Sequence, residues 1–194
     1  MNKARLIELN NLIKSAGGLI QAFHCGRDIG DGKFSIDHLG SGEGMAILGP
    51  GIYFITDQSV AEIYSKHHDV PFLYSVMIDT TNFYEDNTGK PEHCLESLLK
   101  IIDDLELKLG HKIKYKNHES LKYGRGSIGD INKAVGHKEC NRLLIENGID
   151  GAIEKLPGGD IELCVFNTSC IKSVEKIPFY RSPELRISQR EWEW

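Results

Sequence analysis

The sequence lacks any long hydrophobic run, which excludes a membrane-spanning helix as its organising element. No uninterrupted apolar stretch approaches the roughly 20 residues that a helix needs to cross a bilayer. Residues 1–18 mix polar with apolar side chains, so they do not form the hydrophobic core of a signal peptide. We therefore expect a cytoplasmic protein without a membrane partner, which a delivery system could still carry into a host or target cell.

A large excess of charge of one sign is also missing. In 194 residues, 23 Lys and Arg oppose 28 Asp and Glu, for a net charge of −5 with histidine neutral. This mild acidity argues against broad electrostatic adhesion to nucleic acid or to anionic lipid. The composition is typical of a soluble globular protein, and the length predicts a single domain over residues 1–194.

Paired cysteines and metal-binding motifs are missing as well. The cysteines are odd in number and scattered, at Cys25, Cys94, Cys140, Cys164 and Cys170. They contain no C-x-x-C and no Cys/His pair at zinc-finger spacing, so we expect free thiols and no metal.

The two common glycine-rich nucleotide motifs do not occur. No G-x-x-x-x-G-K-[ST] is present, and no G-x-G-x-x-G follows a predicted strand and opens a helix. If this chain binds a dinucleotide, it uses another scaffold.

Hydrophobic periodicity predicts short strands mixed with separate helices. This arrangement, without regular β-α-β alternation, predicts an α+β fold. Glycine-rich residues 25–50 are predicted as loop, and the aperiodic tail 179–194 either packs back on the body or contacts a partner. The predicted helices are 2–16, 57–66 with Asp57 as N-cap, 91–109 and 130–147; the predicted strands are 19–24, 51–55, 72–78, 151–155, 162–167 and 171–177.

The segment GPGIYFITDQSVAEIY is the most informative part of the chain. Gly49 and Gly51 flank a predicted tight turn, Tyr53 lies on the strand that follows, and Tyr64 lies on the next helix. By spacing alone, the two tyrosines either clasp a flat heteroaromatic group or serve as core aromatics. Together with Ala61, the pattern Gly-x-Gly-Ile-Tyr-Phe resembles the ADP-ribosyltransferase fold, and within it the diphtheria-toxin-like branch that includes the poly(ADP-ribose) polymerases.

That branch carries a His-Tyr-Glu triad on three separate strands, and this chain has matching residues in the same order. His24 ends an early predicted strand, Tyr53 follows the glycine turn, and Glu162 begins the late strand Glu-Leu-Cys-Val-Phe-Asn. The resemblance covers about residues 19–177. It implies a split β-sheet core with flanking helices around an NAD cleft, as in small transferase domains of phage polyproteins and bacterial toxins.

The resemblance assigns roles to the glutamate and the histidine of the triad. Glu162 would stabilise the positive charge that develops on the ribose next to nicotinamide, and its alternative is a surface glutamate on an edge strand. His24 would hydrogen-bond the adenosine ribose, and its alternative is a satisfied core histidine.

The nicotinamide ring would lie between Tyr53 and Tyr64, with the backbone of Cys25 and Gly26 holding its carboxamide. Cys25 replaces a glycine of the family, and Ala61 replaces a serine that bonds the carboxamide in the polymerases. A reactive Cys25 thiol is a weaker alternative, since nothing near it in sequence predicts a depressed pKa.

Further contacts are expected around the rest of the dinucleotide. Gly51 would allow close approach of the backbone, and Arg27 would pair with the pyrophosphate unless it is simply exposed. Ser41 begins a glycine-rich stretch that is either a lid over the adenine side or a solvated loop. Basic residues near a predicted loop would face an acceptor or only solvent, namely Lys122, Arg125 and Lys133.

The resemblance implies that NAD donates ADP-ribose to a macromolecular acceptor and that nicotinamide leaves. The acidic balance favours a protein acceptor over nucleic acid. If the protein is a toxin or effector, an antitoxin or immunity protein would be a partner. Two alternatives stay open: an NAD glycohydrolase, and a non-catalytic module that binds ADP-ribose or NAD.

Overall fold

The computed structural model shows an α+β fold, as the sequence predicts. It describes residues 18–38, 48–67, 72–85, 90–113, 128–156 and 159–178. The predicted helix over 2–16, the loop that contains Ser41 and the tail 179–194 lie outside the described residues.

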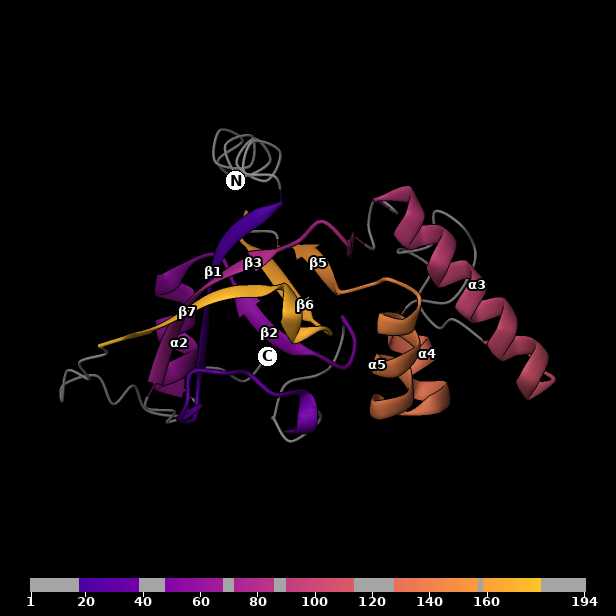
Figure 1. Cartoon of the computed structure of the whole chain (residues 1–194), viewed down its shortest axis with the longest axis horizontal. Helices are drawn as coiled ribbons and strands as arrows, with labels where there is room; N and C mark the ends of the chain where they lie inside the picture. The colour runs from indigo at the N-terminus through magenta and orange to yellow at the C-terminus, as the bar shows by residue number, and fades with distance from the viewer. Residues whose placement is uncertain are drawn as a thin grey trace.

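One mixed seven-stranded sheet organises the described chain (Figure 1). Its order is β4-β5-β6-β2-β1-β3-β7, in which β4 runs parallel to β5 and the other neighbours are antiparallel. All six predicted strands are confirmed; β4 was not predicted, because three residues are too few for an alternating pattern. The strands are β1 Leu19–Gly26, β2 Ile52–Ile55, β3 Phe72–Asp79, β4 Phe83–Glu85, β5 Gly151–Lys155, β6 Ile161–Val165 and β7 Ile171–Ile177.

The α-helices largely follow the predicted ranges: α2 Gln58–His67, α3 Glu92–Leu109, α4 Ile128–Val135 and α5 His137–Glu146. Short 3-10 turns occur at η1 Ile36–His38 and η2 Thr168–Cys170. Asp57 is confirmed as the cap of α2, because its Oδ1 accepts from the amide of Ser59 at 2.8 Å. None of the helices in the described ranges is both long and apolar enough to cross a bilayer.

The single helix predicted over 130–147 is wrong, because Gly136 divides it into α4 and α5. The φ of Gly136 is +81°, a conformation outside the right-handed helix that glycine adopts easily. The apolar periodicity of the two halves is nearly continuous, which explains why the pattern alone does not reveal the break.

Helices cover one face of the sheet, which we call the helix-covered face. At one end, Ala61 of α2 packs with Phe23, Ile55 and Leu73. At the other end, α3, α4 and α5 bury a larger cluster against β5 and β6, and Figure 1 shows these two groups of helices at opposite ends. Between the two groups lies a band of sheet where both clusters end, with Tyr53 packed against the larger cluster and Ile55 in the smaller one.

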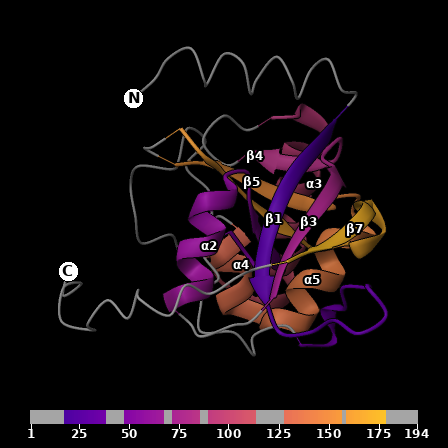
Figure 2. The same cartoon turned by 90° about the vertical axis from the view of Figure 1, so that its left-hand side faces the viewer.

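The opposite face of the sheet carries a second core cluster. Its described core comes from the strands and from η2, with Phe34 packed against it from the loop after β1. Figure 2 shows β1 and β3 running in a clearly different direction from β5, so the sheet is strongly twisted. The core residues are Ile20, Ala22, Phe54, Val76, Ile78, Phe83, Ile153, Ile161, Leu163, Val165 and Cys170.

The sheet is close to dividing between β1 and β2. Every residue of β1 pairs with β3, whereas the described pairing of β1 with β2 consists of Phe23 opposite Ile55. The predicted His24 and Tyr53 lie on these two strands, beside the point where the backbone pairing ends.

A buried asparagine fastens α5 to the sheet. Asn141 is only 3% exposed, and its Nδ2 donates to the carbonyls of Pro50 at 3.0 Å and Phe166 at 3.2 Å. These carbonyls precede β2 and follow β6, so one side chain holds the ends of two central strands.

Asn141→Ala is expected to lower the free energy of unfolding by about 2–4 kcal/mol, because two buried carbonyls lose their donor. Urea denaturation measures the change. Asn147→Ala is the matched control, since Asn147 is half-buried and donates to the single carbonyl of Leu143. We expect the control to lose about 1 kcal/mol or less of unfolding free energy. Equal losses in the two variants would contradict the role of Asn141 in fastening α5 to the sheet.

Candidate functional site

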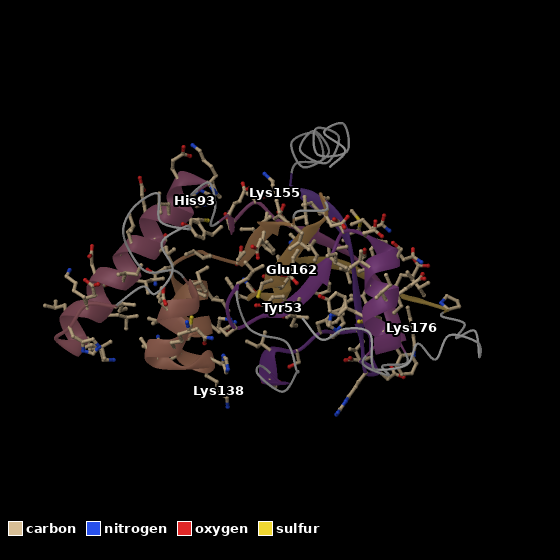
Figure 3. All side chains as sticks on the ribbon, turned by 180° about the vertical axis from the view of Figure 1, so that it is seen from behind. Tyr53, His93, Lys138, Lys155, Glu162 and Lys176 are labelled. Atoms are coloured by element: carbon tan, nitrogen blue, oxygen red, sulfur yellow. The ribbon has the colours of Figure 1, made fainter. Side chains whose placement is uncertain are left out.

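The β2–β6 register places Tyr53 and Glu162 on the same face of the sheet. Tyr53 pairs with Cys164 and Ile55 pairs with Glu162. Because strand side chains alternate between faces, all four point to the helix-covered side, and Tyr53 and Glu162 are diagonal neighbours. Figure 3 shows the two labelled side chains together over the middle of the sheet, in the band between α2 and the α4–α5 pair.

Glu162 is a half-buried carboxylate in this band. Burial, followed by the charge of Glu154, raises the pKa of Glu162 above its usual range. Glu154 lies directly opposite on β5. The surroundings of Glu162 therefore disfavour its ionised form. Such carboxylates are common in catalytic sites.

The hydroxyl of Tyr53 forms hydrogen bonds with the turn that precedes β2. It accepts from the amide of Leu48 and donates to the carbonyl of Gly49, both at 3.1 Å. Burial is the main cause that raises the pKa of Tyr53, so the phenol stays protonated. The ring packs against the α3–α5 cluster, and its role in a site would be stacking rather than proton transfer.

The two glycines of this turn are required by packing within the chain. A Cβ at Gly51 would lie 2.4 Å from the carbonyl oxygen of Val165, and one at Gly49 would lie 2.5 Å from Cγ2 of Ile128. Gly49 also has a φ of +118°. The close backbone approach predicted at Gly51 is thus made by β6 of the same chain.

His24 meets Tyr53 through the tyrosine backbone. Nδ1 of His24 lies 2.7 Å from the carbonyl oxygen of Tyr53, and its ring contacts Phe34 and Phe54 on the face opposite the Tyr53 ring. A carbonyl only accepts, so Nδ1 carries the proton of the neutral ring. Burial lowers the pKa of His24, which keeps the ring neutral at pH 7 and leaves Nε2 as an acceptor.

Gly26 gives the His24 ring its space. A Cβ at Gly26 would lie 2.7 Å from Nε2 of His24. Cys25 between them pairs with Leu73 on the helix-covered face, and burial raises the pKa of its thiol. Cys25 is accordingly a thiol rather than a reactive thiolate.

The other predicted contact residues divide into exposed and buried positions. Arg27 is exposed directly after β1, and Tyr64 is 51% exposed on α2. Ala61 is 2% exposed and fills the cluster under α2, so this position serves packing. Lys133 is exposed on α4, 3.9 Å from Asp130.

Three predicted residues, Ser41, Lys122 and Arg125, lie outside the described residues. Within the described ranges, no group of three His, Cys, Asp or Glu side chains is arranged to hold a metal ion.

Glu154 is the residue that the sequence analysis missed. The sequence does contain a signal for it, because β5 and β6 are consecutive strands that form a hairpin. Counting pairs outward from the turn between them sets Glu154 opposite Glu162. The aromatic contacts of Phe34 with His24, Phe54 and Tyr74 carried no such signal, since Phe34 lies in a loop.

Comparison with known proteins leaves the chain without a family. No protein-family model matches it, and no curated protein matches it significantly. A solved structure described as the crystal structure of an anti-CRISPR protein is similar to it at 14% identity, over 82% of this chain and 96% of that chain, with a TM-score of 0.39. A likeness of this size supports no conclusion about fold or activity.

Glu162→Gln is expected to stabilise the protein at pH 7, with a melting temperature about 1–3 °C higher. The folded state raises the pKa of Glu162, so its ionised form opposes folding above the unfolded pKa. This penalty disappears as the pH falls below that value, and the two proteins should then melt alike. Thermal melts from pH 7 to pH 4 test this, with the exposed Glu175→Gln as control; a less stable Glu162→Gln at pH 7 would contradict it.

Proposed function

We propose that this chain is an NAD-dependent ADP-ribosyltransferase that moves ADP-ribose to a macromolecular acceptor, with protein favoured over nucleic acid. The observation that carries the proposal is the β2–β6 register, which sets Glu162 and Tyr53 side by side on one face. The residue pattern that resembles the diphtheria-toxin-like branch assigns these two positions to the nicotinamide end of NAD.

The environment of Glu162 suits stabilisation of a cationic sugar. When the bond between nicotinamide and ribose breaks, nicotinamide leaves with the bonding electrons and positive charge develops on the ribose. A half-buried carboxylate stabilises that charge more than an exposed one, because water screens it less. The acceptor then bonds to the ribose carbon and releases its proton to solvent.

The Tyr53 ring supports placement of nicotinamide beside that carboxylate. Its hydroxyl is held by Leu48 and Gly49, so the ring is fixed in one orientation. An offset stack of a flat ring on a fixed aromatic adds about 0.5–1.5 kcal/mol beyond area burial. Tyr64, half-exposed on α2, is the proposed partner on the other side of nicotinamide.

His24 has the proton arrangement that a ribose contact needs. Nδ1 donates to Tyr53, which leaves Nε2 to accept from a ribose hydroxyl. Because the His24 ring lies on the face opposite Tyr53 and Glu162, the proposal requires the dinucleotide to cross the sheet where the β1–β2 pairing ends. Arg27 follows Gly26 at the end of β1 and is exposed, so its guanidinium is the proposed partner of the pyrophosphate.

The direct test incubates the protein with NAD labelled in the adenylate and with a cell lysate. Wild type should transfer label to an acceptor and release nicotinamide, whereas Glu162→Gln should lose about 10²–10³-fold in rate. Glu175→Gln should match wild type. Protease or nuclease digestion of the product identifies the acceptor class.

Two outcomes of that assay would redirect the proposal. Nicotinamide release that is fast without any acceptor would make the protein an NAD glycohydrolase. NAD binding by calorimetry without nicotinamide release would make it a binding module. Equal labelling by wild type and Glu162→Gln would contradict the role of Glu162.

A pair of His24 variants separates its two nitrogens. His24→Asn keeps a donor near the Tyr53 carbonyl but removes the Nε2 acceptor, whereas His24→Gln extends a polar atom toward the Nε2 position. We expect His24→Asn to raise KM for NAD about 10-fold, because one hydrogen bond is lost, while His24→Gln retains more affinity. Equal KM values for His24→Asn and wild type would remove His24 from the NAD site.

A further inference from the structure

The hairpin of β5 and β6 brings a second carboxylate to the band where Glu162 lies. Glu154 is the direct cross-strand partner of Glu162 in the antiparallel register. Directly opposite residues share a face, with Cβ atoms about 4.5–5.5 Å apart. Glu154 and Glu162 are both half-buried. The strand pairing therefore keeps the two carboxylates close together. Rotation of the side chains can increase the distance between them only in part.

No cation compensates this pair within the described part of the chain. The neighbouring Lys155 projects from the other face of β5, where its Nζ lies 2.7 Å from Glu85. None of the described ion pairs involves Glu154 or Glu162. Like charges directly opposite on a sheet are destabilising, so the arrangement opposes folding and calls for a functional explanation.

The titratable groups around Glu162 come from three strands and one helix. Glu154 lies on β5, Tyr53 on β2 and Cys164 on β6 itself. The described titratable side chains of α2, which covers the adjoining end of this face, are Glu62 and Tyr64. Because Tyr53 and Cys164 keep their protons at neutral pH, Glu154 is the charged group directly facing Glu162.

We propose that Glu154 and Glu162 act as a carboxyl pair, in which the charge of Glu154 adds to burial in setting the pH at which Glu162 takes up its proton. Glu154 is a positioning residue in this account, since it acts through Glu162. With both groups ionised, the pair concentrates negative charge beside the ribose site. In mild acid Glu162 takes up its proton, and its charge is no longer available to a cationic sugar. The inference rests on the proposed function for its catalytic consequence, but not for the pairing itself.

The catalytic test is the pH profile of kcat/KM for NAD. In wild type, activity should fall on the acid side as Glu162 is protonated. Glu154→Gln removes the facing charge while keeping the shape, so the acid limb should move to lower pH by about one unit. Glu154→Asp keeps the charge and should keep the limb within a few tenths of a unit. The exposed Glu175→Gln should not move it.

A second measurement reads the pairing without turnover. Carboxyl ¹³C resonances of labelled glutamate, assigned through Glu154→Gln and Glu162→Gln, give the titration of each group. In wild type the Glu162 resonance should titrate at higher pH than in Glu154→Gln, again by about one unit. An unchanged Glu162 titration in a folded Glu154→Gln overturns the pair, whatever the activity.

The two measurements separate failure of the pair from failure of the proposed function. If no protein consumes NAD at any pH but the Glu162 titration shifts, the pair stands and the transferase assignment fails. If activity depends on Glu162 but neither the acid limb nor the resonance responds to Glu154→Gln, the assignment stands and the pair is overturned.

Discussion

The pairing of β2 with β6 is the constraint on which the rest of this structure depends. It sets Tyr53 opposite Cys164 and Ile55 opposite Glu162, so one register decides which side chains share the helix-covered face. A slip of one residue would send Glu162 into the apolar core on the other face. At the end of this pairing Asn141 donates to Pro50 and Phe166, and Gly51 has no side chain that would clash with Val165, so both residues favour this register.

Around this register the protein keeps polar groups in positions that oppose folding. Glu162 is half-buried beside Glu154, and both burial and charge raise its pKa. His24 donates to a strand carbonyl where the β1–β2 backbone pairing ends, and a neutral ring suits that place. Such groups are retained where a site needs them, since an apolar core would be more stable. The facing carboxylates of Glu154 and Glu162 are what distinguishes this band from the two covered ends of the sheet.

Much of the fold can be predicted from the sequence, because most strands longer than three residues have a clear apolar pattern, with β7 the imperfect case, and α3 has regular helical spacing. The break at Gly136 and strand β4 could not, since one depends on a single φ value and the other on pairing with a distant strand. For the site, the motifs placed Tyr53 and Glu162 on strands, and the structure shows that these strands, β2 and β6, are neighbours. The ring of His24 lies on the other face, because its neighbour Phe23 is the residue that pairs with Ile55, and this register cannot be read from spacing. The position of Glu154 beside Glu162 follows from the register of the β5–β6 hairpin, and no motif indicates it.

The most direct test of the central claim is a crystal structure of the Glu162→Gln protein soaked with NAD, because we expect this variant to bind the donor without consuming it. The account predicts the nicotinamide ring against Tyr53, its ribose beside residue 162, and a ribose hydroxyl within hydrogen-bond distance of Nε2 of His24. A dinucleotide bound elsewhere on the protein, with residues 53 and 162 untouched, would contradict the account.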